Sequence, residues 1–278
     1  MIGWIAVIER ASMHLDVIGL REFYDRPLGM MVRRLIGHRL RARWRDVREM
    51  SVFGIGYAVP YLGAFRADAR RIGALMPAAQ GVVVWPDDAP RAAALVDEMD
   101  LPLPDSSADR VLVVHALEST EAARALLREV WRVLAPEGRV MIVVPNRRSI
   151  WARLDSTPFG HGRPFSRGQL AGLLREGMFA PIDWTQGLYM PPLDWPLLLR
   201  SAIAIERIGA VLWPAFSGVI MVEATKQVYA AVPGRERAAA RRRFVPVPGA
   251  ATARSGLSAR SVLTAISYAK AGTPPARR

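Results

Sequence analysis

Short apolar segments alternate with amphipathic ones from residue 49 to residue 225, and this alternation constrains the fold more than any other feature. The apolar segments, such as residues 110–114, have the composition of buried strands. Residues 120–134 repeat apolar side chains every three or four positions, which is typical of a helix packed on one face. Strands that alternate with helices favour right-handed crossovers. The sequence therefore predicts an α/β fold with a seven-stranded, mostly parallel sheet and helices on both faces.

The same patterns place the individual elements. Strands are expected at residues 49–53, 71–75, 93–97, 110–114, 139–144, within 179–189 and at 217–225. Helices are expected at residues 20–45, 60–69, 120–134, 166–176 and 195–212. The apolar stretch 208–222 is shorter than the roughly 20 residues that a membrane-spanning helix needs, so we expect no span there. We expect this stretch to be a buried helix end followed by a buried strand.

Composition removes several classes of active site. The 278 residues include no cysteine and four histidines. Thiol nucleophiles, disulfide frameworks and cysteine-bound metals are therefore excluded. The sequence also has no cluster with metal-ligand spacing, so we expect no metal site.

The formal charge of +13 is concentrated near the end of the chain, where residues 226–278 hold 11 of the 38 Lys and Arg residues and one of the 25 acids. We expect an extension at 1–19, with Met13 as an alternative start, a folded domain at 20–229 and a basic, disordered tail at 230–278. The tail could contact nucleic acid, but it lacks interleaved aromatic residues, so a solubilising role is favoured. Without a signal sequence, a cytoplasmic location is expected.

A glycine turn follows the first expected strand. Gly54 and Gly56 are followed by Ala58 at a third small position. Glycine lets the backbone approach a ligand closely. Ligands of open α/β sheets bind outside the carboxyl ends of the strands, where the strand order reverses. We therefore expect a nucleoside-sized hollow beside Gly54 and Gly56.

Two further segments carry a recognisable order of residues. Residues 97–112 read DEMDLPLPDSSADRVL, and residues 126–139 read LLREVWRVLAPEGR. With the glycine turn before them, these segments resemble the class I S-adenosylmethionine-dependent methyltransferases, especially the broad small-molecule group called type 11. The resemblance implies a Rossmann-like methyltransferase fold, S-adenosylmethionine as the cofactor, and a transferase that acts on a small-molecule methyl acceptor.

The resemblance also implies a cofactor site. It would consist of Gly54, Gly56, Ala58, Met76, Asp97 and Glu98. Asp97 matches the acid that contacts the adenine amino group in the family, and Glu98 is its neighbour. Two positions depart from the family pattern, because Val52 replaces an acid before the glycine turn and Met76 stands where an acid would bind the ribose hydroxyls. Each lost charged hydrogen-bond partner weakens binding by about 1.5–3 kcal/mol.

These departures support two alternatives to an active small-molecule methyltransferase. The first is a catalytically degenerate protein of the same fold that binds or regulates. The second is an RNA methyltransferase that uses the basic tail as an electrostatic footprint.

Residues after the fourth and fifth expected strands provide candidate catalytic and substrate-binding groups. His115 could act as a general base on a hydroxyl, or it could be a hydrogen-bonded structural residue. His161 and Arg163 lie in a glycine-flanked loop that could hold an anionic or hydroxylated substrate, or brace only itself. Arg147 directly follows a strand, where arginine suits a carboxylate or phosphate. Tyr189 is expected in the wall of an apolar pocket or in the core. The sequence assigns neither the methyl acceptor nor the oligomeric state.

Overall fold

The computed structural model describes residues 16–228, and residues 1–15 and 229–278 lie outside the described part. The expectations about the basic tail and about Met13 as an alternative start therefore concern residues outside the described part.

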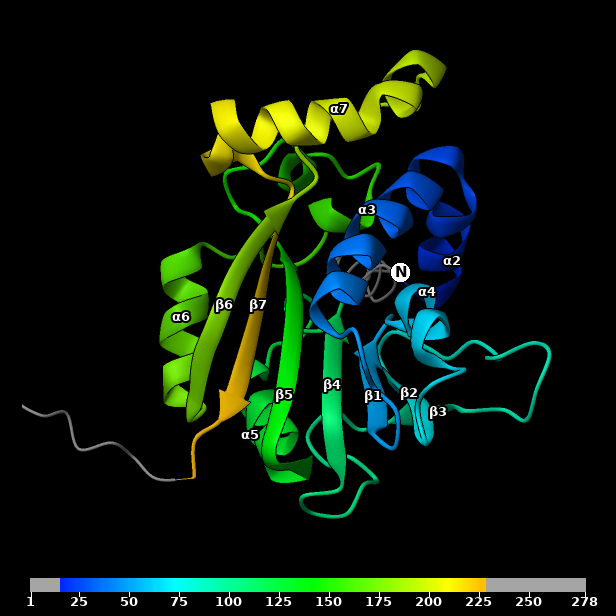
Figure 1. Ribbon diagram of the computed structural model, residues 1–278, viewed down its shortest axis with the longest axis vertical. Coiled ribbons are helices and arrows are strands. Elements are labelled where there is room, and N and C mark those ends of the chain that lie inside the picture. Colours follow the sequence, from blue (N-terminus) through cyan, green and yellow to red (C-terminus); the bar gives the residue numbers. More distant parts are fainter. Residues whose placement is uncertain (1–15, 229–278) are drawn as a thin grey trace, which may run out of the picture. The chain divides into compact units, whose positions relative to one another are not determined.

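Within residues 16–228, seven strands form one sheet (Figure 1). They are β1 (Ser51–Gly56), β2 (Arg71–Pro77), β3 (Ala93–Val96), β4 (Ala108–Val114), β5 (Leu134–Pro145), β6 (Phe179–Gly187) and β7 (Val219–Lys226). Their order is β3-β2-β1-β4-β5-β7-β6. The first five strands pair in parallel, and β7 is antiparallel to both β5 and β6. The predicted α/β class and mostly parallel sheet are thus confirmed.

Helices connect the strands and cover both faces of the sheet. They are α2 (Val17–Asp25), α3 (Pro27–Arg43), α4 (Val59–Leu62), α5 (Ala123–Val133), α6 (Arg167–Glu176) and α7 (Pro196–Leu212). Short 3-10 turns are η1 (Gly63–Phe65), η2 (Trp151–Arg153), η3 (Pro158–Gly160) and η4 (Pro214–Phe216).

The core consists of two apolar clusters, one on each face of the sheet. Successive strand residues point to opposite faces, so Leu112 joins the cluster that contains Ile36 of α3, whereas Val111 joins the cluster that contains Leu126 of α5 and Leu174 of α6. Sequences that bury both faces of a strand read as continuous apolar runs, which is why β4 was identifiable.

The expected helix at 20–45 is in fact two helices. Asp16 caps α2 by accepting a hydrogen bond at 2.8 Å from the Gly19 N–H. Pro27 begins α3, where a missing N–H leaves no helical bond unmade. Because α2 begins at Val17, the last residues of the expected extension belong to the folded domain. The helix expected at 60–69 is also shorter, since α4 ends at Leu62 and continues only as η1.

The C-terminal end of α7 corrects another expectation. We expected a buried helix end there, but Val211 and Leu212 are exposed. The strand that follows was expected to be buried, and residues 219–222 are. Within residues 16–228, no helix has both the length and the apolar character that crossing a membrane requires.

Candidate functional site

The strand order reverses between β1 and β4, and the chain segments after these strands define the expected ligand site. Tyr57 follows β1, Gln80 lies just after β2, and His115 follows β4. The amide Nε2 of Gln80 donates a hydrogen bond at 2.8 Å to the His115 carbonyl oxygen, so these segments meet. We call the space at the carboxyl ends of β1, β2 and β4, next to Tyr57, Gln80 and His115, the trench.

Helix α2 lies across this trench. At one end of the helix, the Val17 N–H donates to the Gln80 carbonyl oxygen at 2.8 Å. At the other end, the Tyr24 ring stacks on Tyr57 with centroids 5.7 Å apart, and the Tyr24 hydroxyl is 2.9 Å from His115 Nε2. The nine residues of α2 span about 13 Å at 1.5 Å per residue. A single helix therefore contacts the segments that follow β1, β2 and β4.

Aromatic side chains close the space beneath α2. The Tyr24 hydroxyl also lies 2.9 Å from the Tyr61 hydroxyl, and the Phe23 ring meets Phe159 edge-on. Burial raises the pKa of Tyr24 well above its usual value, and neighbouring Tyr61 adds to the rise. Burial also raises the pKa of Tyr57 to about 12. These phenols stay neutral at physiological pH and act as hydrogen-bonding core residues.

The small residues of the glycine turn face protein in this conformation. Gly56 has a φ of +79°, and a Cβ there would clash with the Val114 carbonyl oxygen. A Cβ at Gly54 would lie 2.6 Å from the Ala58 Cβ. Gly54, Gly56 and Ala58 are all buried. The glycines are thus required by the close packing of β1 on β4 and on the turn that starts α4.

The remaining residues of the expected cofactor site do not converge on a shared hollow. Met76 is completely buried, and its sulfur accepts a hydrogen bond at 3.4 Å from the Val83 N–H. Asp97 is exposed, and its Oδ1 accepts at 2.8 Å from the Met99 N–H within its own turn. The carboxylate of Glu98 accepts a hydrogen bond from the Thr120 hydroxyl. A hollow of about 210 Å³ beside α2 is lined by Tyr24 and Tyr57, but it is smaller than the roughly 300 Å³ of small ligand pockets.

His115 and Glu118 form a buried pair next to the trench. His115 Nδ1 is 3.3 Å from Glu118 Oε1, and both side chains are almost completely buried. The carboxylate of Glu118 has no hydrogen-bond partner that meets the usual geometry. Because His115 Nε2 is within hydrogen-bond distance of the Tyr24 hydroxyl, the imidazole bridges a carboxylate and a hydroxyl. A histidine that contacts a carboxylate on one side and a hydroxyl on the other can act as a general base. Here, however, the hydroxyl is that of Tyr24 in α2 and not that of a substrate.

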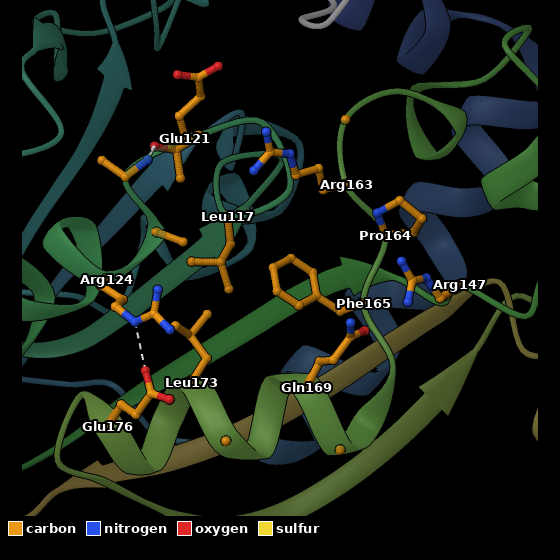
Figure 2. Close-up of a pocket in the computed structure, with 16 residues that line it drawn as sticks. Leu117, Glu121, Arg124, Arg147, Arg163, Pro164, Phe165, Gln169, Leu173 and Glu176 are labelled. Atoms are coloured by element: carbon orange, nitrogen blue, oxygen red, sulfur yellow. Dashed lines mark hydrogen bonds and ion pairs between the residues drawn. The ribbon is translucent and has the colours of Figure 1, made fainter.

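A larger cavity of about 680 Å³ lies at the carboxyl ends of β4 and β5. It is lined by Leu117, Thr120, Glu121, Arg124, Arg147, Arg163, Phe165, Gln169, Leu173 and Glu176, among others. Figure 2 shows the apolar side chains of this group gathered in the middle, with polar side chains around them. The structure thus brings together Arg147 and Arg163, two of the four residues that the sequence suggested for substrate.

The other two candidates lie apart from this cavity. His161 Nε2 is 2.9 Å from the Asp155 carbonyl oxygen, a contact that braces its own loop. Tyr189 is buried, and its hydroxyl donates to Gln186 Oε1 at 3.3 Å. Neither residue lines the cavity that contains Arg147 and Arg163. Among residues 16–228, His, Asp and Glu side chains also form no cluster suited to a metal ion.

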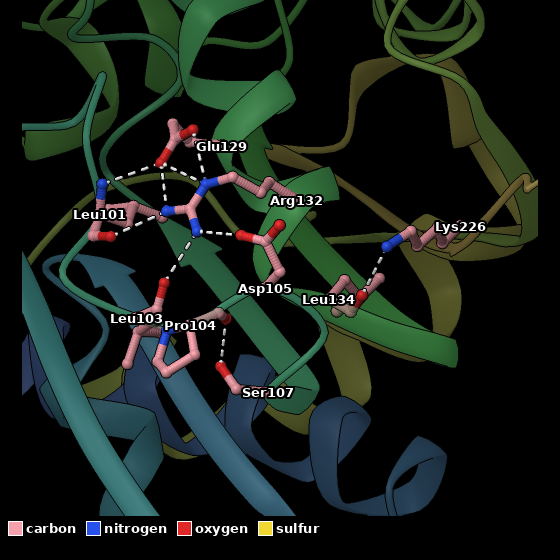
Figure 3. A network of polar contacts seen from close by, with 9 residues as sticks. All are labelled: Leu101, Leu103, Pro104, Asp105, Ser107, Glu129, Arg132, Leu134 and Lys226. Atoms are coloured by element: carbon pink, nitrogen blue, oxygen red, sulfur yellow. Dashed lines mark hydrogen bonds and ion pairs between the residues drawn. The ribbon is translucent and has the colours of Figure 1, made fainter.

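Sequence reasoning missed two important side chains. Tyr24 was not singled out, since its amphipathic segment indicates a packed helix but not the surface on which it packs. Arg132 lies in the segment 126–139, whose sequence pattern predicts a helix and a turn but no role for this side chain. The fork of its guanidinium joins α5 to the turn before β4 through two backbone carbonyls and two carboxylates (Figure 3).

The trench as it stands does not fit the expected cofactor. S-adenosylmethionine would have to occupy the space above Tyr57, Gln80 and His115, and α2 is there. At Gly81, an added Cβ would lie 3.1 Å from Val17, so the first residue of α2 packs closely on the turn after β2. Val52 and Met76 stand at the two positions where the resemblance implies acids, and both are buried apolar residues. These positions therefore supply no carboxylate to the cofactor.

The similarities to known proteins are consistent with the fold of the sheet. Residues 54–142 match the family model described as a methyltransferase domain. Among curated proteins none matches this sequence. The chain resembles the crystal structure of the cyclase SpnF with a TM-score of 0.51 at 20% identity, over 70% of this chain and 80% of that one.

A second solved structure shares the same fold. A SAM-dependent methyltransferase from Archaeoglobus fulgidus aligns with a TM-score of 0.50 at 17% identity, over 70% of this chain and 94% of that one. The matched sequence contains the glycine turn, Asp97 and Arg132. Residues 54–142 are therefore similar to a methyltransferase domain, and the sheet has the Rossmann-like fold of class I S-adenosylmethionine-dependent methyltransferases.

Proposed function

We propose that this chain methylates a small molecule that carries a carboxylate or phosphate group. The observation that carries the proposal is the presence of Arg147 and Arg163 at one cavity of about 680 Å³, a volume typical of small-molecule sites. A guanidinium binds both oxygens of a carboxylate or phosphate through parallel N–H groups. Leu117 and Phe165 add apolar walls for the rest of the molecule.

The charge state of the cavity supports an anionic acceptor. Arg124 is paired with Glu176 at 2.7 Å, so its charge is balanced within the cavity. In the described part of the chain, neither Arg147 nor Arg163 forms an ion pair. Two exposed guanidinium groups at one cavity attract an anion of matching size.

The proposal also assigns a role to the His115–Glu118 pair. The carbonyl oxygen of Glu118 accepts a hydrogen bond at 2.8 Å from the Arg163 N–H, while its carboxylate contacts His115. Glu118 therefore joins the expected base to the loop that carries Arg163. An acceptor hydroxyl in the position of the Tyr24 hydroxyl would lie within reach of His115 Nε2, which could take its proton. His161, placed on a separate loop, has no part in this proposal.

Methyl transfer requires a second conformation of the chain. S-adenosylmethionine needs the trench, and α2 fills it in the conformation described. The proposal therefore includes the departure of α2 from Tyr57 and His115 before the cofactor binds.

The test is a methyl-transfer assay with radiolabelled S-adenosylmethionine and a panel of carboxylic acids and phosphate monoesters, each paired with its neutral ester or alcohol. We expect methylation to be confined to the anionic members. Arg147→Gln and Arg163→Gln should each lower kcat/KM by about tenfold or more, as expected for a lost charged hydrogen bond. Arg148→Gln is the matched control, because Arg148 is adjacent and exposed but does not line the cavity. Equal effects of all three variants would contradict the proposal.

A second candidate is a protein of this fold that does not transfer methyl groups. The position of α2 and the absence of acids at Val52 and Met76 favour it, and a fold does not by itself fix a reaction. Calorimetric titration with S-adenosylhomocysteine separates the two candidates. Micromolar binding would support the methyltransferase, and no heat at millimolar ligand would support the inactive protein.

A further inference from the structure

Helix α7 contacts the domain through a face on which few residues are buried. Of its 17 residues, only Ala202, Glu206 and Gly209 are buried. A Cβ at Gly209 would clash with Tyr189, so the helix approaches its neighbour closely at that point. Glu206 forms an ion pair with Arg39 at 2.8 Å and accepts hydrogen bonds from backbone N–H groups of residues 188–190. Small and charged residues therefore hold α7 closely to the domain, together with the partly buried Leu199 and Ile205, which pack on the core.

The opposite face of α7 is apolar and exposed. Leu197, Val211 and Leu212 are 75%, 79% and 67% exposed, and Ile208 is 52% exposed. The helix crosses the top of the view in Figure 1, outside the helices that cover the sheet. The exposed aromatic side chains Trp195, Trp213 and Phe216 flank its two ends. Contiguous exposed apolar surface of this kind marks an interaction site.

The charges next to this face are basic. The exposed charged residues of α7 are Arg200 and Arg207, which are seven positions apart and so lie on one line of the helix. Beside them, a groove of about 440 Å³ between α3 and α7 has the apolar side chains of Met30, Met31 and Ile203 and the guanidinium groups of Arg34 and Arg200. Apolar surface bordered by arginines matches a bilayer interface, where acyl chains lie beneath anionic phosphates.

We propose that α7 binds the surface of a bilayer that contains anionic phospholipid. The helix lies in the plane of the interface, with Leu197, Ile208 and Val211 among the acyl chains and Arg200 and Arg207 at the headgroup phosphates. Tryptophans at both ends of the helix suit the headgroup level of a membrane. A second copy of this chain fits less well, because a two-fold contact would bring the arginines of one α7 toward those of the other.

Vesicle flotation with the full chain tests this proposal, using phosphatidylcholine vesicles with and without 30% phosphatidylglycerol. We expect binding to the anionic vesicles that weakens as salt rises. Val211→Asp with Leu212→Asp should reduce that binding at least tenfold, and Arg200→Gln and Arg207→Gln should reduce it about fivefold each. Val211→Asp alone is compared with Met99→Asp as the control, since Met99 is exposed on the turn after β3 and each of these substitutions adds one negative charge. Unchanged binding by the α7 variants would overturn the proposal, because other basic residues would then account for it.

The absence of cysteine allows a direct test of insertion. Val211→Cys would carry the chain's only thiol, and so would Met99→Cys in a second protein. With an environment-sensitive fluorophore on that thiol, we expect a blue shift on addition of anionic vesicles at position 211 and none at position 99. Equal responses would overturn the proposal. A second outcome would also overturn it. In that outcome vesicles cause no shift, and the chain forms a concentration-dependent dimer that the Val211→Asp and Leu212→Asp substitutions dissociate.

Discussion

Tyr24 shows at the scale of one residue how the trench is closed. Its hydroxyl meets both His115 and Tyr61, while its ring stacks on Tyr57. Sequence analysis identified His115 because of its place after a strand, but nothing in a single sequence indicates which hydroxyl reaches it. That pairing depends on the docking of α2, which is a tertiary event.

The raised tyrosine pKa values predict how stability depends on alkaline pH. Burial raises the pKa of Tyr24 and Tyr57 above 10, so above that pH the folded state binds more protons than the unfolded state. The free energy of unfolding must therefore fall as pH rises, by about 1.4 kcal/mol per pH unit for each such group. Tyr24→Phe should cost about 0.5–1.5 kcal/mol at pH 8 through lost hydrogen bonds and make the decline above pH 10 less steep.

Urea unfolding at several pH values between 8 and 11.5 measures both effects. Curves for Tyr24→Phe and the unsubstituted chain that run parallel above pH 10 would show that Tyr24 is not buried as described.

At the scale of the element, Arg132 fixes α5 to the turn before β4. Its Nη1 donates to the Leu103 carbonyl and to Asp105, and its Nη2 donates to the Leu101 carbonyl and to Glu129 (Figure 3). These bonds hold the pKa of Glu129 below its usual range. A lysine carries one compact ammonium group instead of a planar guanidinium group, so it cannot donate to all four of these acceptors at once.

Arg132→Lys should therefore lower the free energy of unfolding by about 1–3 kcal/mol. The comparison is Arg128→Lys, because Arg128 is exposed on the same helix. Urea denaturation of the two variants measures the difference, and equal stabilities would show that the fork contributes nothing beyond its charge.

The elements also show which features a sequence pattern can predict. Strand β4 and helix α5 were predicted because one is a continuous apolar run and the other has clear helical periodicity. The break at Pro27 was missed, since the apolar spacing continues across it. The end of α7 was expected to be buried because hydropathy records the character of residues 208–212 and not the partner that covers them.

At the scale of the molecule, the sheet explains why the fold was predictable and the site was not. The order of the strands follows from the class of fold, and so does the location of a ligand site at the carboxyl ends of the parallel strands. The positions of Gly54, Arg147 and His115 near those ends could therefore be anticipated. The α2 helix comes before the matched residues 54–142, and no motif within that range specifies where it packs. The described conformation therefore combines a familiar sheet with a trench that its own N-terminal helix occupies.

Helix α2 fills the site that the cofactor needs, and a reversible disulfide between α2 and the turn after β2 can show whether it controls binding there. An added Cβ at Gly81 would lie 3.7 Å from the Val17 Cβ, within the range of disulfides. Val17→Cys with Gly81→Cys would thus introduce the chain's only cysteine pair, at a strain of about 1–3 kcal/mol because Gly81 has a φ of +91°.

Calorimetric titration of this one protein with S-adenosylhomocysteine, first oxidised and then reduced, is the decisive measurement. We expect the reduced protein to bind and the oxidised protein to bind at least a hundredfold more weakly. Equal affinity in the two redox states would show that α2 does not block the site, and no binding in either would show that the trench is not a cofactor site.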